Sequence, residues 1–217
     1  MFNLIRKNKY FLCPYFGIIL IISIILLSYS KSEIHLFINK FHNSFFDLFF
    51  KYYTHLGDGI VVAVFIFILL FIKYRYAIIT AISGILAIIV VQSLKRYIIP
   101  DVNRPELFFK GIHELYFVPD VITHTSHSFP SGHTTTGFLI FFISALITNN
   151  KFLKFLFLIF AILIGYSRVY LSQHFLNDVY FASIFSIIIG FFTFFWVSNW
   201  KNNKLDNSIL NLFNSKI

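Results

Sequence analysis

His174 and Asp178 are the pair of residues whose types and spacing point most directly to chemistry. They are four positions apart, so on a helix both side chains lie on one face. The carboxylate can then accept the proton on one imidazole nitrogen, which leaves the other nitrogen as a lone-pair nucleophile. Because neutral imidazole is well populated at about pH 7, this pair indicates nucleophilic catalysis.

A second segment, Pro130-Ser131-Gly132-His133, is typical of a helix start that binds an anion. Pro130 precedes Ser131, and a serine suits the N-cap position. The first backbone N–H groups of a helix lack internal partners and lie at the positive end of its dipole. Gly132 would let a ligand oxygen approach the backbone closely. The segment therefore predicts an anion site.

Three cations, Lys95, Arg104 and Arg168, complete the set. The planar guanidinium groups can grip phosphate oxygens, and the lysine adds a compact charge. Fixed cations at a helix terminus oppose a dianion and the charge that spreads over a phosphoryl transition state. These residues predict a phosphate site, provided that the fold brings them together.

The elements that must position these residues are membrane helices. Of the 217 residues, 58% are hydrophobic, 21% are aromatic and 12% are charged, and the mean hydropathy is +0.77. A soluble domain carries about 25% charged residues, so the composition excludes a water-soluble globule, and it equally excludes a disordered chain. The single cysteine excludes an intramolecular disulfide and a cysteine-based zinc cluster.

Uncharged apolar runs predict an all-α bundle of six transmembrane helices at residues 10–30, 59–72, 76–94, 134–150, 155–167 and 179–200. A helix needs about 20 residues to cross the hydrocarbon. The short second and fifth runs reach that length if Lys73, Arg75, Lys151 and Lys154 extend to the head groups. The membrane domain then covers residues 10–200, between a basic tail at 1–9 and a loosely ordered tail at 201–217.

The polar segments and the first run complete this organisation. Residues 31–58 carry phenylalanines at a spacing compatible with a helix in the membrane interface. Residues 95–133 hold four of the five prolines and predict an ordered loop. The first run exceeds the apolar stretch of a signal peptide and lacks a small-residue cleavage site, so we interpret it as a retained span. Cys13 precedes most of that run, which argues against a lipoprotein signal, and we expect it to be buried.

The six-span topology brings the chemical residues to one membrane face. Lys95 follows the third span, His133 opens the fourth, and Arg168 closes the fifth. The opposite face holds ten of the eighteen Lys and Arg residues. The positive-inside rule then puts both termini in the cytoplasm and the active-site segments, 95–133 and 167–178, outside.

Together these residues resemble the three-part signature of the type 2 phosphatidic acid phosphatase (PAP2) superfamily. The second and third parts match without a gap or substitution, as Pro130-Ser131-Gly132-His133 and Ser167-Arg168-x5-His174-x3-Asp178. The first part departs from the pattern. In the family pattern six residues usually separate the first basic residue from Arg-Pro. In this chain eight residues separate Lys95 from Arg104-Pro105, and seven separate Arg96 from it. Either basic residue can therefore fill that position.

The resemblance implies a membrane phosphatase that uses no metal or other cofactor. It implies that His174 attacks phosphorus to form a phosphohistidine and that Asp178 orients His174. His133 would protonate the leaving group and then activate water. The residues implied to hold the phosphoryl oxygens are Lys95, Arg104, Ser131, Gly132 and Arg168.

The implied partners are the bilayer and a lipid or polyprenyl phosphate substrate. Members of this family act on phosphatidate, phosphatidylglycerol phosphate, undecaprenyl diphosphate or lipid A. The stretches around 50–60 and 165–178 are most similar to lipid A phosphatases and undecaprenyl-diphosphatases. We expect hydrolysis at the outer face of a bacterial cytoplasmic membrane. The same residues also allow a lipid phosphotransferase.

Other classes fit the sequence less well. A non-enzymatic anion transporter needs charges along its pathway, and the interior of each predicted span has none. A vanadium haloperoxidase shares the site but is soluble. The net charge of +9 lies in membrane-flanking turns, so anionic head groups explain it better than nucleic acid does.

Two further features have alternative explanations. The spacing of His113, His124 and His127 matches no compact metal-ligand motif, and we place these histidines at the substrate entry. Asp58, at the edge of the second span, either has a functional role or caps the helix that follows.

Overall fold

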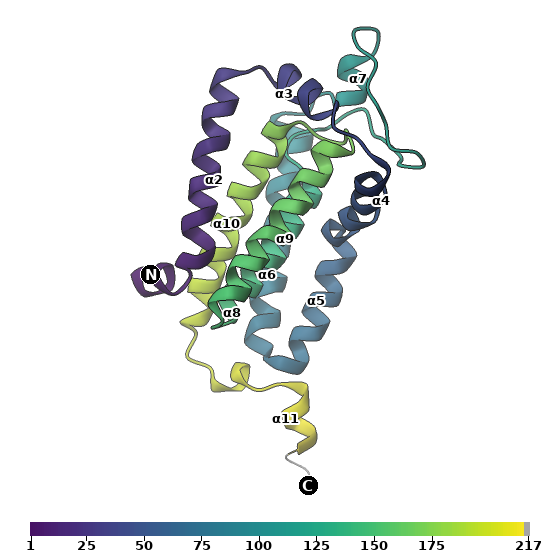
Figure 1. The fold of residues 1–217 in the computed structure, drawn as a ribbon. Coiled ribbons are helices and arrows are strands. Elements are labelled where there is room, and N and C mark those ends of the chain that lie inside the picture. Colours follow the sequence, from purple (N-terminus) through teal and green to yellow (C-terminus); the bar gives the residue numbers. More distant parts are fainter. Residues whose placement is uncertain (215–217) are drawn as a thin grey trace.

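The computed structural model describes residues 1–214, and every regular element in that range is a helix. Six long apolar helices form the bundle in Figure 1, and each coincides with one of the predicted apolar runs. They are α2 (Lys9–Ser28), α5 (Gly59–Ile72), α6 (Tyr74–Ser93), α8 (Gly132–Ile147), α9 (Lys151–Tyr170) and α10 (Leu176–Ser198). Residues 215–217 of the predicted tail lie outside the described residues.

Shorter elements cover the two ends of the bundle. Figure 1 shows α3 and α7 at one end, and the α5–α6 turn and the carboxyl-terminal tail at the other. The helix predicted within residues 31–58 is confirmed, and residues 95–133 form a loop that also contains a short helix. These elements are α1 (Phe2–Lys7), α3 (Lys31–Ile38), α4 (Ser44–Tyr53), a 3₁₀ turn (Thr54–Gly57), a π-helical turn (Leu94–Ile98), α7 (Pro105–Phe109), a 3₁₀ turn (Asn203–Asp206) and α11 (Ile209–Asn214).

Within the described residues, four helices are long and apolar enough to cross a membrane, namely α2, α6 with its π-helical extension, α9 and α10. The segments Ser44–Gly57 and Gly59–Ile72 meet at an angle of 59° and would form a fifth span if counted together. Helix α8 is apolar but has only 16 residues, fewer than the roughly 20 that the hydrocarbon requires. The all-helical membrane fold is confirmed. The count of six spans and the division into residues 1–9, 10–200 and 201–217 stay predictions.

Helix α8 lies at the centre because it is apolar on all sides and small residues let its neighbours approach. A Cβ atom on Gly137 of α8 would lie 2.6 Å from Cδ1 of Ile164 in α9. A Cβ atom on Gly165 of α9 would lie 2.9 Å from Cγ1 of Val179 in α10. Such close approach is typical of helix pairs in membranes. These crossings bring the start of α8 beside the end of α9 and the start of α10.

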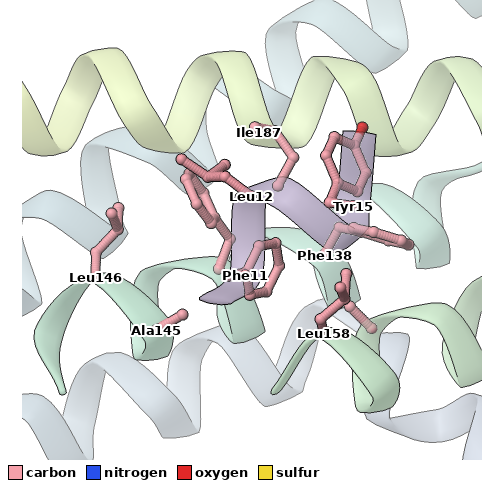
Figure 2. Close-up of a cluster of buried hydrophobic side chains, with 10 residues drawn as sticks. Phe11, Leu12, Tyr15, Phe138, Ala145, Leu146, Leu158 and Ile187 are labelled. Carbon is pink, nitrogen blue, oxygen red and sulfur yellow. The ribbon is translucent and has the colours of Figure 1, made fainter. Parts of the chain in front are cut away.

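Helix α2 packs into the same core, as Figure 2 shows. Its Phe11 and Tyr15 contact aromatic rings of α8, with centroids 5.1 Å from Phe142 and 6.0 Å from Phe138. Cys13 lies on the exposed side of α2. The prediction that this cysteine is buried is therefore wrong, because the phenylalanine and tyrosine occupy the inward face.

Two basic residues expected to reach the head groups are buried instead. The Arg75 guanidinium donates hydrogen bonds to both carboxylate oxygens of Asp206, at 2.8 and 3.0 Å, and to the carbonyl of Val197 at 2.8 Å. Lys154 Nζ donates to the Asn8 side chain and to the carbonyl of Ala145. The snorkelling prediction is therefore wrong for both. Asp206 also anchors the tail that was predicted to be loosely ordered.

His35 connects α3 to the loop before α10. Its ring stacks on Phe109 and meets Phe175 edge-on, with centroid distances of 5.8 and 5.3 Å. Nε2 lies 3.2 Å from Ser172 Oγ, whereas Nδ1 is buried without a partner. Burial, and to a smaller extent the nearby His42, lower the pKa of His35 from 6.5 to about 4. Protonation of this buried ring therefore opposes folding.

We expect the protein to lose stability as the pH falls from 6.5 to 4. In that window the unfolded state binds a proton at His35 that the folded state rejects, so the free energy of unfolding decreases by up to about 3 kcal/mol. Thermal unfolding in detergent at several pH values measures this effect. His35→Gln should make the pH dependence less steep, while His113→Gln, at an exposed loop histidine, should leave it unchanged. Equal slopes in the wild type and His35→Gln would contradict the prediction.

Candidate active site

His174 and Asp178 form a buried pair at the start of α10. Nδ1 of His174 lies 3.2 Å from Asp178 Oδ2. The same carboxylate oxygen accepts hydrogen bonds from the Ser128 hydroxyl at 2.5 Å and from the Phe175 backbone N–H at 3.0 Å. A carboxylate held in this way accepts the proton of Nδ1, and Nε2 of His174 is left with its lone pair.

The surroundings of His174 keep its ring neutral. The side chain is almost completely buried, and burial lowers its pKa well below the ordinary value of 6.5. The positive charges of Arg104, Arg168 and Lys95 lower the pKa further, as does His133. Neutral imidazole therefore dominates at physiological pH, which a nucleophile requires. These charge effects also show that the predicted residues converge around one ring.

Arg104 and Lys95 are fixed by backbone carbonyls rather than by carboxylates. The Arg104 guanidinium donates to the carbonyl of Ser126 at 2.9 Å and to that of Gln173 at 3.1 Å. Lys95 Nζ donates to the carbonyl of His127 at 2.9 Å. Neutral partners orient both cations without cancelling their charges, so the charges remain available to an anion.

Arg168, in the last turn of α9, is buried and one of its three guanidinium nitrogens has no partner among residues 1–214. Its guanidinium donates to Thr54 Oγ1 at 2.6 Å and more weakly to Gln173 Oε1 at 3.4 Å. Its Nε is buried without a hydrogen-bond partner. An unsatisfied buried N–H on a charged group costs stability, which indicates a site prepared for an oxygen ligand.

Ser131 caps α8 as predicted. Its hydroxyl oxygen accepts from the Thr134 backbone N–H at 3.3 Å. The Ser131 backbone N–H donates to the carbonyl of Asp178 at 3.2 Å, which joins the start of α8 to the start of α10. In the part of the chain that the structure describes, the N–H groups of Gly132 and His133 have no acceptor. The predicted anion site therefore retains two backbone donors.

His133 faces the segment between α4 and α5. Its Nε2 lies 2.7 Å from Asp58 Oδ1. Gly57 is pressed against it, since a Cβ atom there would lie 2.8 Å from the carbonyl oxygen of His133. Thr54, three residues earlier, holds Arg168. One short turn thus contacts two of the predicted site residues.

The structure distinguishes between Lys95 and Arg96. Lys95 donates a hydrogen bond to the carbonyl of His127, and its charge lowers the pKa of His174, so it lies near the site. Arg96 is exposed to the surroundings. Both lie in the π-helical turn Leu94–Ile98. A π turn accommodates one extra residue relative to an α-helix, which accounts for one of the two extra residues between Lys95 and Arg104 in this chain.

The loop histidines have separate environments. His127 pairs with Lys95, and its Nδ1 lies 3.1 Å from that residue's carbonyl oxygen. His124 lies near the cationic cluster, since burial and then the charge of Arg104 lower its pKa. His113 lines a different cavity, beside Glu106 and Glu114. Among the described residues, no three His, Cys, Asp or Glu side chains are grouped so that they could hold a metal ion.

Sequence reasoning missed three residues that hold the site together, namely Ser128, Thr54 and Gln173. Ser128 bonds to Asp178, and both Thr54 and Gln173 bond to Arg168. Ser128 and Gln173 each lie within two residues of a recognised motif, which was a usable signal. Thr54 lies 114 positions from its partner, and no local pattern indicated it.

Comparison with known proteins tests whether this arrangement has relatives. The sequence profile described as the PAP2 superfamily matches residues 75–203, which include every predicted site residue. This chain belongs to the PAP2 superfamily. The predicted family is therefore confirmed, and the protein is an integral membrane protein of that family.

Individual relatives agree with this assignment. The chain is 38% identical over 90 residues to undecaprenyl-diphosphatase BcrC of Bacillus subtilis. That match covers 37% of this chain and 46% of the relative, so it spans about half of the relative's length.

Two crystal structures share the fold of this PAP2 protein. LpxE of Aquifex aeolicus is 25% identical with a TM-score of 0.66, over 74% of this chain and 92% of LpxE. A transmembrane PAP2-type phosphatidylglycerolphosphate phosphatase from Bacillus subtilis is 23% identical with a TM-score of 0.55, over 89% and 98% of the two chains. The second likeness shows the fold alone.

Proposed function

We propose that this protein is a membrane phosphatase that hydrolyses a lipid or polyprenyl phosphate through a phosphohistidine. The observation that carries the proposal is the neutral, carboxylate-oriented His174 surrounded by three cations. A dianionic phosphoryl group fits this charge arrangement, and within residues 1–214 Lys95 and Arg104 form no ion pair with a carboxylate and bond to backbone carbonyls instead.

In the first step His174 Nε2 attacks phosphorus, and the P–N bond forms as the bond to the lipid oxygen breaks. Asp178 holds the Nδ1 proton and stabilises the developing positive charge on the ring. His133 gives a proton to the departing oxygen. In the second step water attacks phosphorus, its proton returns to His133, and the P–N bond breaks to release phosphate and neutral His174.

The remaining site residues would bind the phosphoryl oxygens. Arg168 Nε is the buried donor without a partner, and the N–H groups of Gly132 and His133 are open at the start of α8. Ser131 orients that start through its capping bond. Donors fixed before the substrate arrives stabilise a phosphoryl transition state without reorganisation. Lys95 and Arg104 add charge to the same pocket.

An apolar cavity beside the site supports a lipid as the substrate. It has a volume of about 500 Å³ and begins at Gly57, Gly132 and His133, within the size range of small-molecule pockets. It continues between α5, α6 and α8 along small and aliphatic side chains, which include Gly59, Ala63, Ala81, Gly84, Ala87 and Leu139. A hydrocarbon chain attached to a phosphate beside His133 can occupy this space.

Filling the cavity should separate lipid substrates from short ones. Gly84→Leu places a branched side chain in the cavity, where the ideal Cβ meets only Val62 at 3.4 Å. Loss of about three buried methylene groups costs about 2 kcal/mol, or about 30-fold in kcat/KM. We expect that loss for long-chain phosphatidate and undecaprenyl diphosphate, with little change for a short, water-soluble phosphate ester.

The matched control is Gly17→Leu, on the exposed face of α2, where an added Cβ meets nothing within 4 Å. It should leave every substrate unaffected. Phosphate release by the purified protein across this panel is the measurement. An equal loss for long and short substrates in Gly84→Leu would contradict the tail site, and no release by the wild type would contradict the proposed function.

We also propose that the site faces the outside of a bacterial cytoplasmic membrane. The charge distribution supports this orientation, since the end of the bundle opposite the site carries nine of the 17 Lys and Arg residues within residues 1–214. Substrates of this class expose their phosphates at the membrane surface while their chains stay in the hydrocarbon. Such a lipid can enter the site from within the bilayer, through the cavity between α5, α6 and α8.

A further inference from the structure

His55, Asp58 and His133 form a chain of polar contacts that the reaction scheme above does not use. Asp58 lies 2.7 Å from His133 Nε2 through one carboxylate oxygen and 2.9 Å from His55 Nδ1 through the other. His133 and Asp58 are each about one-third exposed, whereas the His55 side chain is 65% exposed. The chain therefore leads from His133 to the surrounding water.

The backbone around Asp58 is arranged for this contact. Asp58 occupies the N-cap position of α5, yet its side chain makes no capping hydrogen bond. The bend of 59° between Ser44–Gly57 and Gly59–Ile72 occurs at this residue. Gly57 brings the turn into direct contact with His133, where a larger side chain would clash at 2.8 Å. Asp58 therefore does not cap α5 with its side chain, as an N-cap aspartate usually does, and its carboxylate contacts His133 of α8 instead.

We infer that Asp58 is a positioning residue for His133 and that His55 connects the pair to solvent as a proton relay. This inference rests on the proposed function. Because Nε2 lies against the carboxylate, Nδ1 is the ring nitrogen of His133 that is left to face the phosphate. The carboxylate stabilises the protonated ring that must donate to the leaving oxygen.

The relay keeps His133 protonated at the start of each turnover. When the P–O bond breaks, the Nδ1 proton goes to the lipid oxygen and His133 becomes neutral. When water later attacks phosphorus, its proton reprotonates His133, and each turnover is balanced. Before the substrate binds, His133 exchanges a proton with solvent through Asp58 and His55, so a neutral ring is protonated before the first step and no net proton is taken up during turnover. A phosphate ester whose leaving group departs without being protonated does not depend on this relay in the first step.

The test compares leaving groups in the purified, full-length protein. Nitrophenolate leaves phosphate without being protonated, whereas an alkoxide requires a general acid. General acids contribute about 10²–10⁴-fold, so Asp58→Asn should slow first-turnover alcohol release from a short alkyl phosphate by about 30-fold or more. First-turnover nitrophenol release from nitrophenyl phosphate should fall by less than about 3-fold. Rapid-quench measurement of the first turnover isolates this step.

Asp120→Asn is the matched control, since it neutralises an exposed carboxylate that pairs with Lys51 on the same end of the bundle. Both leaving groups should react at wild-type rates in that variant. Equal losses for both substrates in Asp58→Asn would overturn the inference, because a merely structural defect does not sense the leaving group. Wild-type rates with both would overturn it as well. An inactive wild type would refute the proposed function instead.

A second variant keeps the inference testable if Asp58→Asn does not fold. His55 is exposed, so its removal should leave the fold intact. We expect His55→Ala to slow steady-state turnover of the alkyl phosphate by about 3- to 10-fold, and imidazole added to the buffer should restore the rate. Unchanged turnover, or a loss that imidazole does not restore, would remove His55 from the relay.

Discussion

His174→Ala should abolish phosphate release, with a loss of at least about 10⁴-fold in kcat, because no other group can form the covalent intermediate. His174 is almost completely buried, is oriented by Asp178 and lies within the field of three cations. Water can enter the space that the imidazole leaves in the alanine variant, but Asp178 does not orient that water for attack on phosphorus as it orients the imidazole. Phosphate release from long-chain phosphatidate in detergent measures the loss.

The matched control for this variant is His113→Ala, which removes an exposed loop histidine away from the site. It should retain wild-type activity. Treatment of the wild type with EDTA should also leave the rate unchanged, since Lys95, Arg104 and Arg168 supply the positive charge that a metal ion would otherwise provide. Full activity in His174→Ala would refute the nucleophile, and loss of activity on chelation would refute the metal-free mechanism.

Arg168→Lys should reduce kcat by about 10²- to 10³-fold, the effect typical of removing one transition-state donor. The guanidinium reaches Thr54 and Gln173 while its buried Nε stays open for a phosphate oxygen. A lysine ammonium keeps the charge, but it cannot bond to Thr54, Gln173 and a phosphate oxygen in the geometry of a planar guanidinium. KM should change less than kcat, because the donor acts mainly on charge that develops in the transition state.

Arg75→Lys offers a comparison at the opposite end of the bundle. Arg75 is equally buried and also bonds to several groups, chiefly Asp206 and backbone carbonyls. Its replacement should lower the unfolding temperature and leave kcat of the folded protein near that of the wild type. Steady-state kinetics and thermal unfolding of both variants separate the two effects. A kcat of Arg168→Lys near the wild-type value would contradict the role of Nε.

The convergence of the site could be predicted because hydrophobic length constrains a membrane chain so strongly. Apolar runs define which helix ends share a face, and Lys95, His133 and Arg168 all lie at such ends. His174 and Asp178 are in contact at 3.2 Å, but His174 lies two residues before α10, so the prediction that both share a helix face is wrong. Asp178 instead folds back over the helix entry, where it also accepts from the Phe175 backbone N–H. The signature also indicated the family, and the superfamily match over residues 75–203 confirms that family. The catalytic roles themselves stay proposals.

The contacts that the sequence did not reveal are those set by packing between distant segments. The sequence left two possibilities for Asp58, and only the approach of the α4–α5 turn to His133 decides between them. The burial of Arg75 depends on a partner 131 positions away. Cys13 was misplaced because α2 is apolar on every side, so its inward and outward faces look alike in the sequence.

The central claim is that His174 carries the phosphoryl group during turnover. The most direct measurement is rapid quenching of the purified protein during steady-state hydrolysis of a lipid phosphate, followed by mass spectrometry of the residue 168–178 peptides under alkaline conditions. We predict one phosphate on the imidazole of His174 in the wild type, and none in His174→Ala. Phosphate on another residue, or hydrolysis at the wild-type rate without any phosphorylated intermediate at the earliest quench times, would contradict the mechanism.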